Sequence, residues 1–156
     1  MTVTAYFYGY ALAGALGGTN AGSGCSFDWL SDTINVALAT AYTPNQDTHQ
    51  YWASASANEI ANGNGYATGG STLAGKTMVY TAAENAIHFD ADDLTWGTAT
   101  ISASQAVIYD TTTAGSPLLG WVDFGGTVSS TSGDFKITWG TAGLFTITPA
   151  NATGYP

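Results

Sequence analysis

The chain has 156 residues, the size of one domain with a single hydrophobic core. It carries 11 acidic residues but only two basic ones, Lys76 and Lys136, which gives a formal net charge of −9. Nucleic acids and anionic membranes are bound through clustered lysines and arginines, so we expect neither as a partner.

The N-terminal segment is apolar and aromatic and then becomes rich in glycine. It lacks the basic residues that begin a secretory signal, and glycine and threonine interrupt it too often for it to span a bilayer. We therefore expect an aromatic and Gly-rich arm, residues 1–24, followed by a single β-rich domain, residues 25–156. The glycine-rich run 17–24 is typical of a flexible connection.

The aromatic side chains of the arm allow two interpretations. Aromatic residues are enriched at protein interfaces, and they also fill hydrophobic cores. The arm could therefore contact a partner or close the core of its own domain. The candidate interface residues are Tyr6, Phe7, Tyr8 and Tyr10.

Beyond the arm, apolar residues recur with the period of a β-strand. Ile34, Val36 and Leu38 alternate with smaller or polar neighbours, as in a half-buried strand. Turn-forming residues separate further strand candidates. We predict an all-β fold, an antiparallel β-sandwich or barrel-like domain of seven or eight short strands with at most one or two short helices. The further strand candidates are residues 77–81, 86–89, 98–103, 106–109, 118–124, 135–139 and 144–148.

Residues 42–65 do not follow this pattern. The segment is too long for a simple connection, so it should contain structure of its own, such as a short helix over residues 47–54, or form a functional excursion. Its aromatic residues Tyr42, Tyr51 and Trp52, with Tyr66 just beyond it, are further candidate interface residues.

Residues 70–77, GSTLAGKT, match the phosphate-binding motif G-x-x-x-x-G-K-[ST]. The motif binds phosphate when a buried strand precedes it and a helix begins at its lysine. Here NGNGYATG precedes it and TMVYT follows, and the second of these favours a strand. We therefore interpret the segment as a Gly-rich turn that leads Lys76, a solvated cation, and Thr77 into a strand.

The segment HFDADDLTWG contains the weak metal candidates Asp90, Asp92 and Asp93. Three carboxylates could contribute to a calcium site, but the pattern lacks the remaining ligands, and aspartates often accept local backbone hydrogen bonds in turns. Paired carboxylates would also suit a glycosidase. His49 and His88 have no second histidine or cysteine nearby. We expect no metal, no cofactor and no catalytic residue.

Several longer segments together resemble a family of small structural proteins of tailed bacteriophages, encoded among head genes. Their order and spacing are similar over roughly residues 27–148, and related Gly-rich and DADD stretches recur in that family without a nucleotide function. The segments are SDTINVALAT, YTPNQDTHQYW, ANEIANGNGYATGGSTLAGKT, FDADDLTWGTATISASQAVIY, SPLLGWVDFGG and FKITWGTAGLFTIT.

The resemblance implies a virion protein that is not an enzyme: a capsid decoration or minor capsid protein on the outside of a head. Its expected partners are the major capsid protein and further copies of itself, as a trimer. Two alternatives stay open. One is a receptor- or carbohydrate-binding module on a head fibre or tail, and the other is an enzyme that hydrolyses nucleotides or glycosides.

Overall fold

The computed structural model describes residues 2–3, 5–16 and 26–149, without the side chains of residues 2 and 3. The glycine-rich run 17–24 and Cys25 lie outside the described residues. In chain order the elements are β1 (Thr2–Val3), β2 (Ala5–Phe7), the helix α1 (Gly9–Ala15), β3 (Ile34–Ala39), the 3-10 helices η1 (Trp52–Ser54) and η2 (Ser56–Asn58), β4 (Ser71–Thr72), β5 (Thr77–Thr81), β6 (Ala86–Asp90), β7 (Leu94–Ala99), β8 (Ser102–Asp110), β9 (Leu118–Ser129), β10 (Gly133–Trp139) and β11 (Phe145–Ile147).

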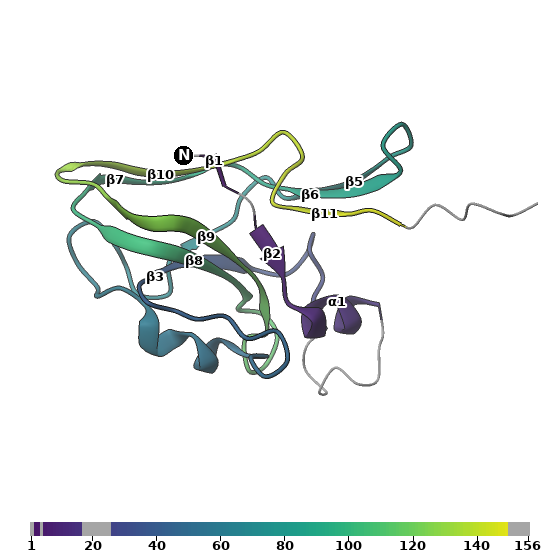
Figure 1. The fold of residues 1–156 in the computed structure, drawn as a ribbon, viewed down its shortest axis with the longest axis horizontal. Coiled ribbons are helices and arrows are strands. Elements are labelled where there is room, and N and C mark those ends of the chain that lie inside the picture. Colours follow the sequence, from purple (N-terminus) through teal and green to yellow (C-terminus); the bar gives the residue numbers. More distant parts are fainter. Residues whose placement is uncertain (1, 4, 17–25, 150–156) are drawn as a thin grey trace, which may run out of the picture.

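The strands form three sheets, which confirms the predicted all-β, sandwich-like class. The largest has the order β2-β9-β8-β3-β4, and the two smaller sheets have the orders β1-β10-β7 and β11-β6-β5. Neighbouring strands are antiparallel except β1 and β10, which are parallel. Figure 1 shows the sheet β11-β6-β5 extending to one side of the sandwich formed by the other two.

The main core lies between the five-stranded sheet and strands β7 and β10. Val36 and Leu38 point into it from β3, and Trp96 and Ile137 from β7 and β10; all four are buried. This alternation is the one that the sequence predicts for β3, because side chains two apart lie on the same face of a sheet.

A second core covers the opposite face of the five-stranded sheet. Ala37 and Ala39 point into it from β3, so this strand is buried on both faces. Residues of the arm and of the segment 42–65 cover these alanines: Tyr8 is fully buried, and its hydroxyl hydrogen-bonds to that of Tyr42. Trp52 stacks on Tyr109 of β8 with ring centroids 4.3 Å apart and planes 6° apart.

The described part of the arm, residues 5–16, packs against the five-stranded sheet and the second core. β2 pairs with β9 along the edge of the five-stranded sheet, and the amide of Tyr8 donates to the carbonyl of Leu119. α1 follows β2 directly, as Figure 1 shows. Residues 5–16 therefore pack as part of the β-rich domain.

Two predicted elements differ from the structure. The candidate strand 98–103 covers the end of β7, the break at residues 100–101 and the start of β8. Thr98, near the end of β7, has a φ of 52°, and Ile101 in the break exchanges backbone hydrogen bonds with Ser130. The helix predicted over 47–54 is replaced by η1 and η2. Asn45 Oδ1 caps a single helical turn, in which the amide of His49 donates to the carbonyl of Asn45. The backbone of Tyr51 is extended, so this turn does not continue, and the next helical turn begins at Trp52.

Candidate functional site

The phosphate-motif segment 70–77 forms two short pieces of sheet joined by a turn. β4 pairs with β3, and β5 begins at Thr77, where a phosphate-binding loop would begin a helix. Gly70 and Gly75 have φ angles of 76° and 61°. The prediction of a Gly-rich turn that leads into a strand is therefore confirmed.

Protein groups bind the amides around this turn. The carboxylate of Glu59 accepts from the amide of Gly69 at 2.6 Å and from the hydroxyl of Tyr66 at 2.7 Å, and the amide of Gly70 donates to the carbonyl of Ala67. A phosphate would have to displace these acceptors. The segment is therefore a turn whose backbone amides are hydrogen-bonded within the protein and are not available to a phosphate.

Lys76 does not lie free in solvent, contrary to the sequence-based interpretation. Its side chain is half-buried, and Nζ donates to the backbone carbonyl of Asp32. The ammonium group thus fastens the turn to the segment that precedes β3. The pattern of residues 70–77 contains no sign of this contact, because Asp32 lies 44 positions away in sequence.

The side chains of two of the three aspartates at the end of β6 and beyond it take different partners, and Asp92 is held through its backbone, whose carbonyl accepts from Trp139 Nε1. Asp90 Oδ1 accepts from the amide of Ala91, whereas Asp93 Oδ1 accepts from the amide of Trp139 and Oδ2 forms an ion pair with Lys136 at 3.0 Å. The hydrogen bond to Lys136 is the largest of the causes that lower the pKa of Asp93. Within the described ranges, no three His, Cys, Asp or Glu side chains gather as they would around a metal ion.

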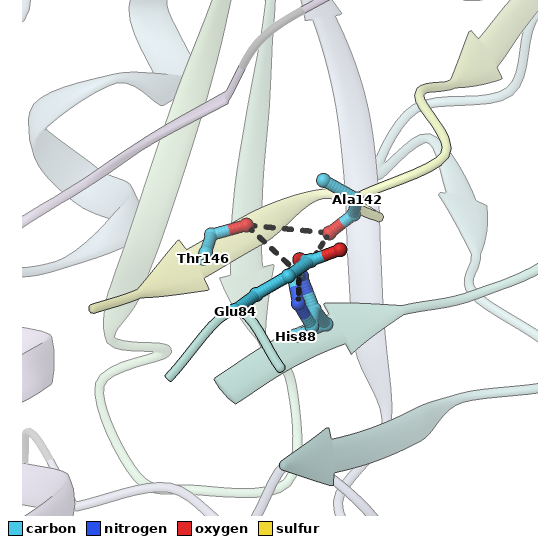
Figure 2. Close-up of polar contacts among 4 residues, drawn as sticks. All are labelled: Glu84, His88, Ala142 and Thr146. Atoms are coloured by element: carbon cyan, nitrogen blue, oxygen red, sulfur yellow. Dashed lines mark hydrogen bonds and ion pairs between the residues drawn. The ribbon is translucent and has the colours of Figure 1, made fainter. Parts of the chain in front are cut away.

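A Glu–His–Thr cluster lies on the sheet β11-β6-β5 and was not foreseen from the sequence (Figure 2). His88 Nε2 is 2.9 Å from Glu84 Oε2, and His88 Nδ1 is 3.2 Å from the carbonyl oxygen of Ala142 and 3.4 Å from Thr146 Oγ1. The Thr146 hydroxyl itself donates to that same carbonyl. To act as a catalytic base, His88 would have to accept the threonine proton at Nδ1. Here Nδ1 faces a carbonyl oxygen, which only accepts hydrogen bonds, so Nδ1 has to be the donor. The cluster therefore ties a loop to the sheet.

The eight aromatic interface candidates have different environments. Tyr8, Tyr42 and Tyr66 are buried in the monomer, so their side chains do not reach a partner; this corrects their selection as interface residues. Burial is the main reason why the pKa of each is raised. The hydroxyl of Tyr66 lies inside the protein and accepts from the amide of Leu38.

The other five candidates are at least partly accessible. Tyr6 is half exposed and stacks on Trp121, with ring centroids 5.3 Å apart. Phe7 stacks on Phe145 at 3.9 Å, and the hydroxyl of Tyr10 donates to the backbone of residue 47 at 3.0 Å. Tyr51 and Trp52 are half-buried, and the face of Trp52 is stacked on Tyr109. Most of this aromatic surface thus packs within the protein.

An apolar groove of about 670 Å³ lies between α1, the segment 26–32 and the sheet β11-β6-β5. Its walls include Phe7, Leu12, Phe27, Trp29, Met78 and Ile87. Leu16 and Leu30 stand at this groove and are largely exposed, as are Met78, Val79 and Tyr80 of β5. Exposed apolar groups at this density are typical of a contact surface. The sequence contains one signal for it, the uncharged run TMVYT.

No family model, no curated protein sequence and no solved structure matches this chain. In the part of the chain that the structure describes, no helix combines the length and the hydropathy needed to cross a membrane.

Proposed function

We propose that this chain is a virion structural protein, a decoration or minor capsid protein that binds the outer surface of a tailed-phage head and stabilises it. Its partners in this proposal are the major capsid protein and further copies of itself, which decoration proteins often assemble as trimers. The resemblance of six ordered segments to phage head proteins motivates the proposal.

The structural observation that carries the proposal is the apolar groove, with Leu30 at its edge. Leu30 is 54% exposed and lies at this groove with the exposed Leu16 and Met78, and exposed apolar residues grouped in this way are typical of a contact surface. A partner that seats a few apolar side chains there would be held by burial of apolar surface. Apolar side chains dominate the lining of the groove, in which Asp28 and Asp32 are the charged residues, so burial of apolar surface should outweigh ion pairs in this contact.

The proposal is tested by adding the purified protein to heads that lack it and measuring co-sedimentation. We expect binding to change less than about threefold between roughly 0.05 and 0.5 M salt, because apolar contacts are not screened. Leu30→Lys should weaken binding by at least about tenfold, since it places a charge in an apolar contact. Thr127→Lys, which adds the same charge to an exposed position of β9, is the control.

Cryo-electron microscopy of the decorated particle then locates the protein. Density on the outside of the shell is expected. Density at the tail alone, or binding that is lost at moderate salt and is insensitive to Leu30→Lys, would refute the proposal.

A further inference from the structure

The outer side of β5 is an exposed edge of a sheet. β5 is the last strand in the order β11-β6-β5, and within the described residues no strand pairs with its outer side. Three consecutive side chains of β5 are about half exposed: Met78 at 48%, Val79 at 54% and Tyr80 at 57%. An edge of this kind offers both backbone hydrogen-bonding groups and apolar surface to another strand.

β5 lacks the features by which a monomeric protein protects such an edge. Charged side chains, prolines and bulges usually block edge-to-edge pairing. Residues 77–81, TMVYT, contain neither charge nor proline, and β5 pairs with β6 in unbroken register from Thr77 to Thr81. Lys76 lies next to the strand, but its ammonium group is held by the carbonyl of Asp32.

We propose that β5 pairs in antiparallel orientation with β5 of a second copy of this chain, about a two-fold axis that passes beside Val79. The two sheets then join into one sheet of six strands. A two-fold axis requires a surface that complements itself, so the residues of β5 must suit each other in reversed order.

The sequence of β5 meets this requirement. With Val79 opposite Val79, Thr77 of each copy faces Thr81 of the other, and Met78 faces Tyr80. Pairs of threonines and pairs of β-branched residues stabilise antiparallel sheets, and a methionine sulfur packs well against an aromatic ring. Every cross-strand pair is therefore a favourable one.

The charges beside β5 are already engaged within each copy. Lys76 Nζ donates to the carbonyl of Asp32, and the carboxylate of Glu84 lies 2.9 Å from His88 Nε2, so neither charge needs a partner from the second copy. The uncharged strand also gives two chains of net charge −9 a place to approach with little repulsion.

The contact is small, so the dimer should be in equilibrium with the monomer. Five residues of strand extend about 17 Å, and an interface of this length falls below the area of a permanent dimer. The two-fold contact joins two copies only, and a closed trimer would require a different contact between unlike surfaces.

Disulfide trapping tests the register. In a Cys25→Ser background, Val79→Cys places two thiols opposite each other at a Cα separation of about 4.5 to 5.5 Å, which suits a disulfide. Under mild oxidation we expect covalent dimers to form at least about tenfold faster than with Leu30→Cys, because pairing raises the effective concentration. Leu30 is the matched control, since it has the same exposed fraction of 54%.

A charge swap tests the association without a covalent bond. In sedimentation velocity at rising concentration, the unmodified protein should show a monomer–dimer equilibrium, whereas Val79→Lys and Val79→Asp should each remain monomeric. Mixing these two variants should restore the dimer, because opposite charges then face each other at the axis. The thermal unfolding of each variant checks that it is folded.

Some results would overturn the proposal: equal trapping rates for the two cysteine variants, self-association unaffected by either charged variant, or a trimer as the associated species. None of these assays contains heads, so they are independent of the proposed function. Loss of self-pairing with intact head binding would refute only the β5 contact, and the reverse result would refute only the decoration role.

Discussion

Replacing Gly70 by alanine tests how the turn of the GSTLAGKT segment is built. Gly70 has a φ of 76°, and a Cβ atom on it would lie 2.0 Å from the carbonyl oxygen of Val36 and 2.5 Å from its carbonyl carbon. Both atoms belong to the backbone of β3, which is held between β8 and β4. The turn can therefore accommodate the methyl group only if the turn or the central sheet moves.

The expected cost has two parts. A left-handed backbone conformation costs a residue with a Cβ atom roughly 1 to 2 kcal/mol, and overpacking against a fixed neighbour costs about 1 to 3 kcal/mol more. The matched control is Gly125→Ala, because Gly125 has a φ of 73° and nothing lies within 4 Å of its added Cβ. We expect Gly70→Ala to lose about 2 to 5 kcal/mol of unfolding free energy and Gly125→Ala only the roughly 1 to 2 kcal/mol of the left-handed backbone conformation.

Urea unfolding followed by tryptophan fluorescence measures both variants, and a scan should show a melting temperature lowered by roughly 10 °C for Gly70→Ala. Equal losses for Gly70→Ala and Gly125→Ala, within about 0.5 kcal/mol, would refute the close contact between the turn and β3. The nucleotide hypothesis would instead be supported if the unmodified protein bound ATP and Lys76→Ala abolished that binding without changing the unfolding free energy.

Two further predictions concern buried and stacked aromatic side chains. Burial raises the pKa values of Tyr8, Tyr42, Tyr66 and Tyr109 above the ordinary value of 10.0. These tyrosines should therefore leave the unfolding free energy unchanged between about pH 8 and pH 9 and lower it as pH rises beyond about 10, by up to about 1.4 kcal/mol per pH unit for each tyrosine that stays protonated in the folded chain. Unfolding curves between pH 8 and pH 11.5 measure this, and unchanged stability at about pH 11 would contradict it. Trp52→Ala should cost about 2 to 4 kcal/mol in urea unfolding, because it removes the ring stacked on Tyr109; a loss below about 0.5 kcal/mol would mean that Trp52 does not support the core.

The parts of the fold that depend on local pattern could be predicted from the sequence. Alternation at Ile34, Val36 and Leu38 placed β3, and the glycines of residues 69–75 placed a turn before β5. The class of fold followed because such signals recur along the whole chain.

Contacts between distant parts of the chain could not be predicted in this way. Tyr8 and Tyr42 are 34 positions apart, and nothing near either residue shows that their hydroxyl groups meet in a core. The contact between His88 and Thr146 likewise depends on which strands become neighbours. The exposure of Val79 depends on β5 being an edge strand, which is a property of sheet order and not of local sequence.

The pairing of β2 with β9 has a consequence for how the chain folds as it is synthesised. Ala5 lies opposite Val122, so β2 cannot pair with β9 until the ribosome has synthesised and released more than 100 further residues. Contacts between such distant parts of a chain slow folding. β2 should therefore be the last strand to join the five-stranded sheet, and until then the nascent chain exposes the apolar surface that Phe7 and Tyr8 later cover.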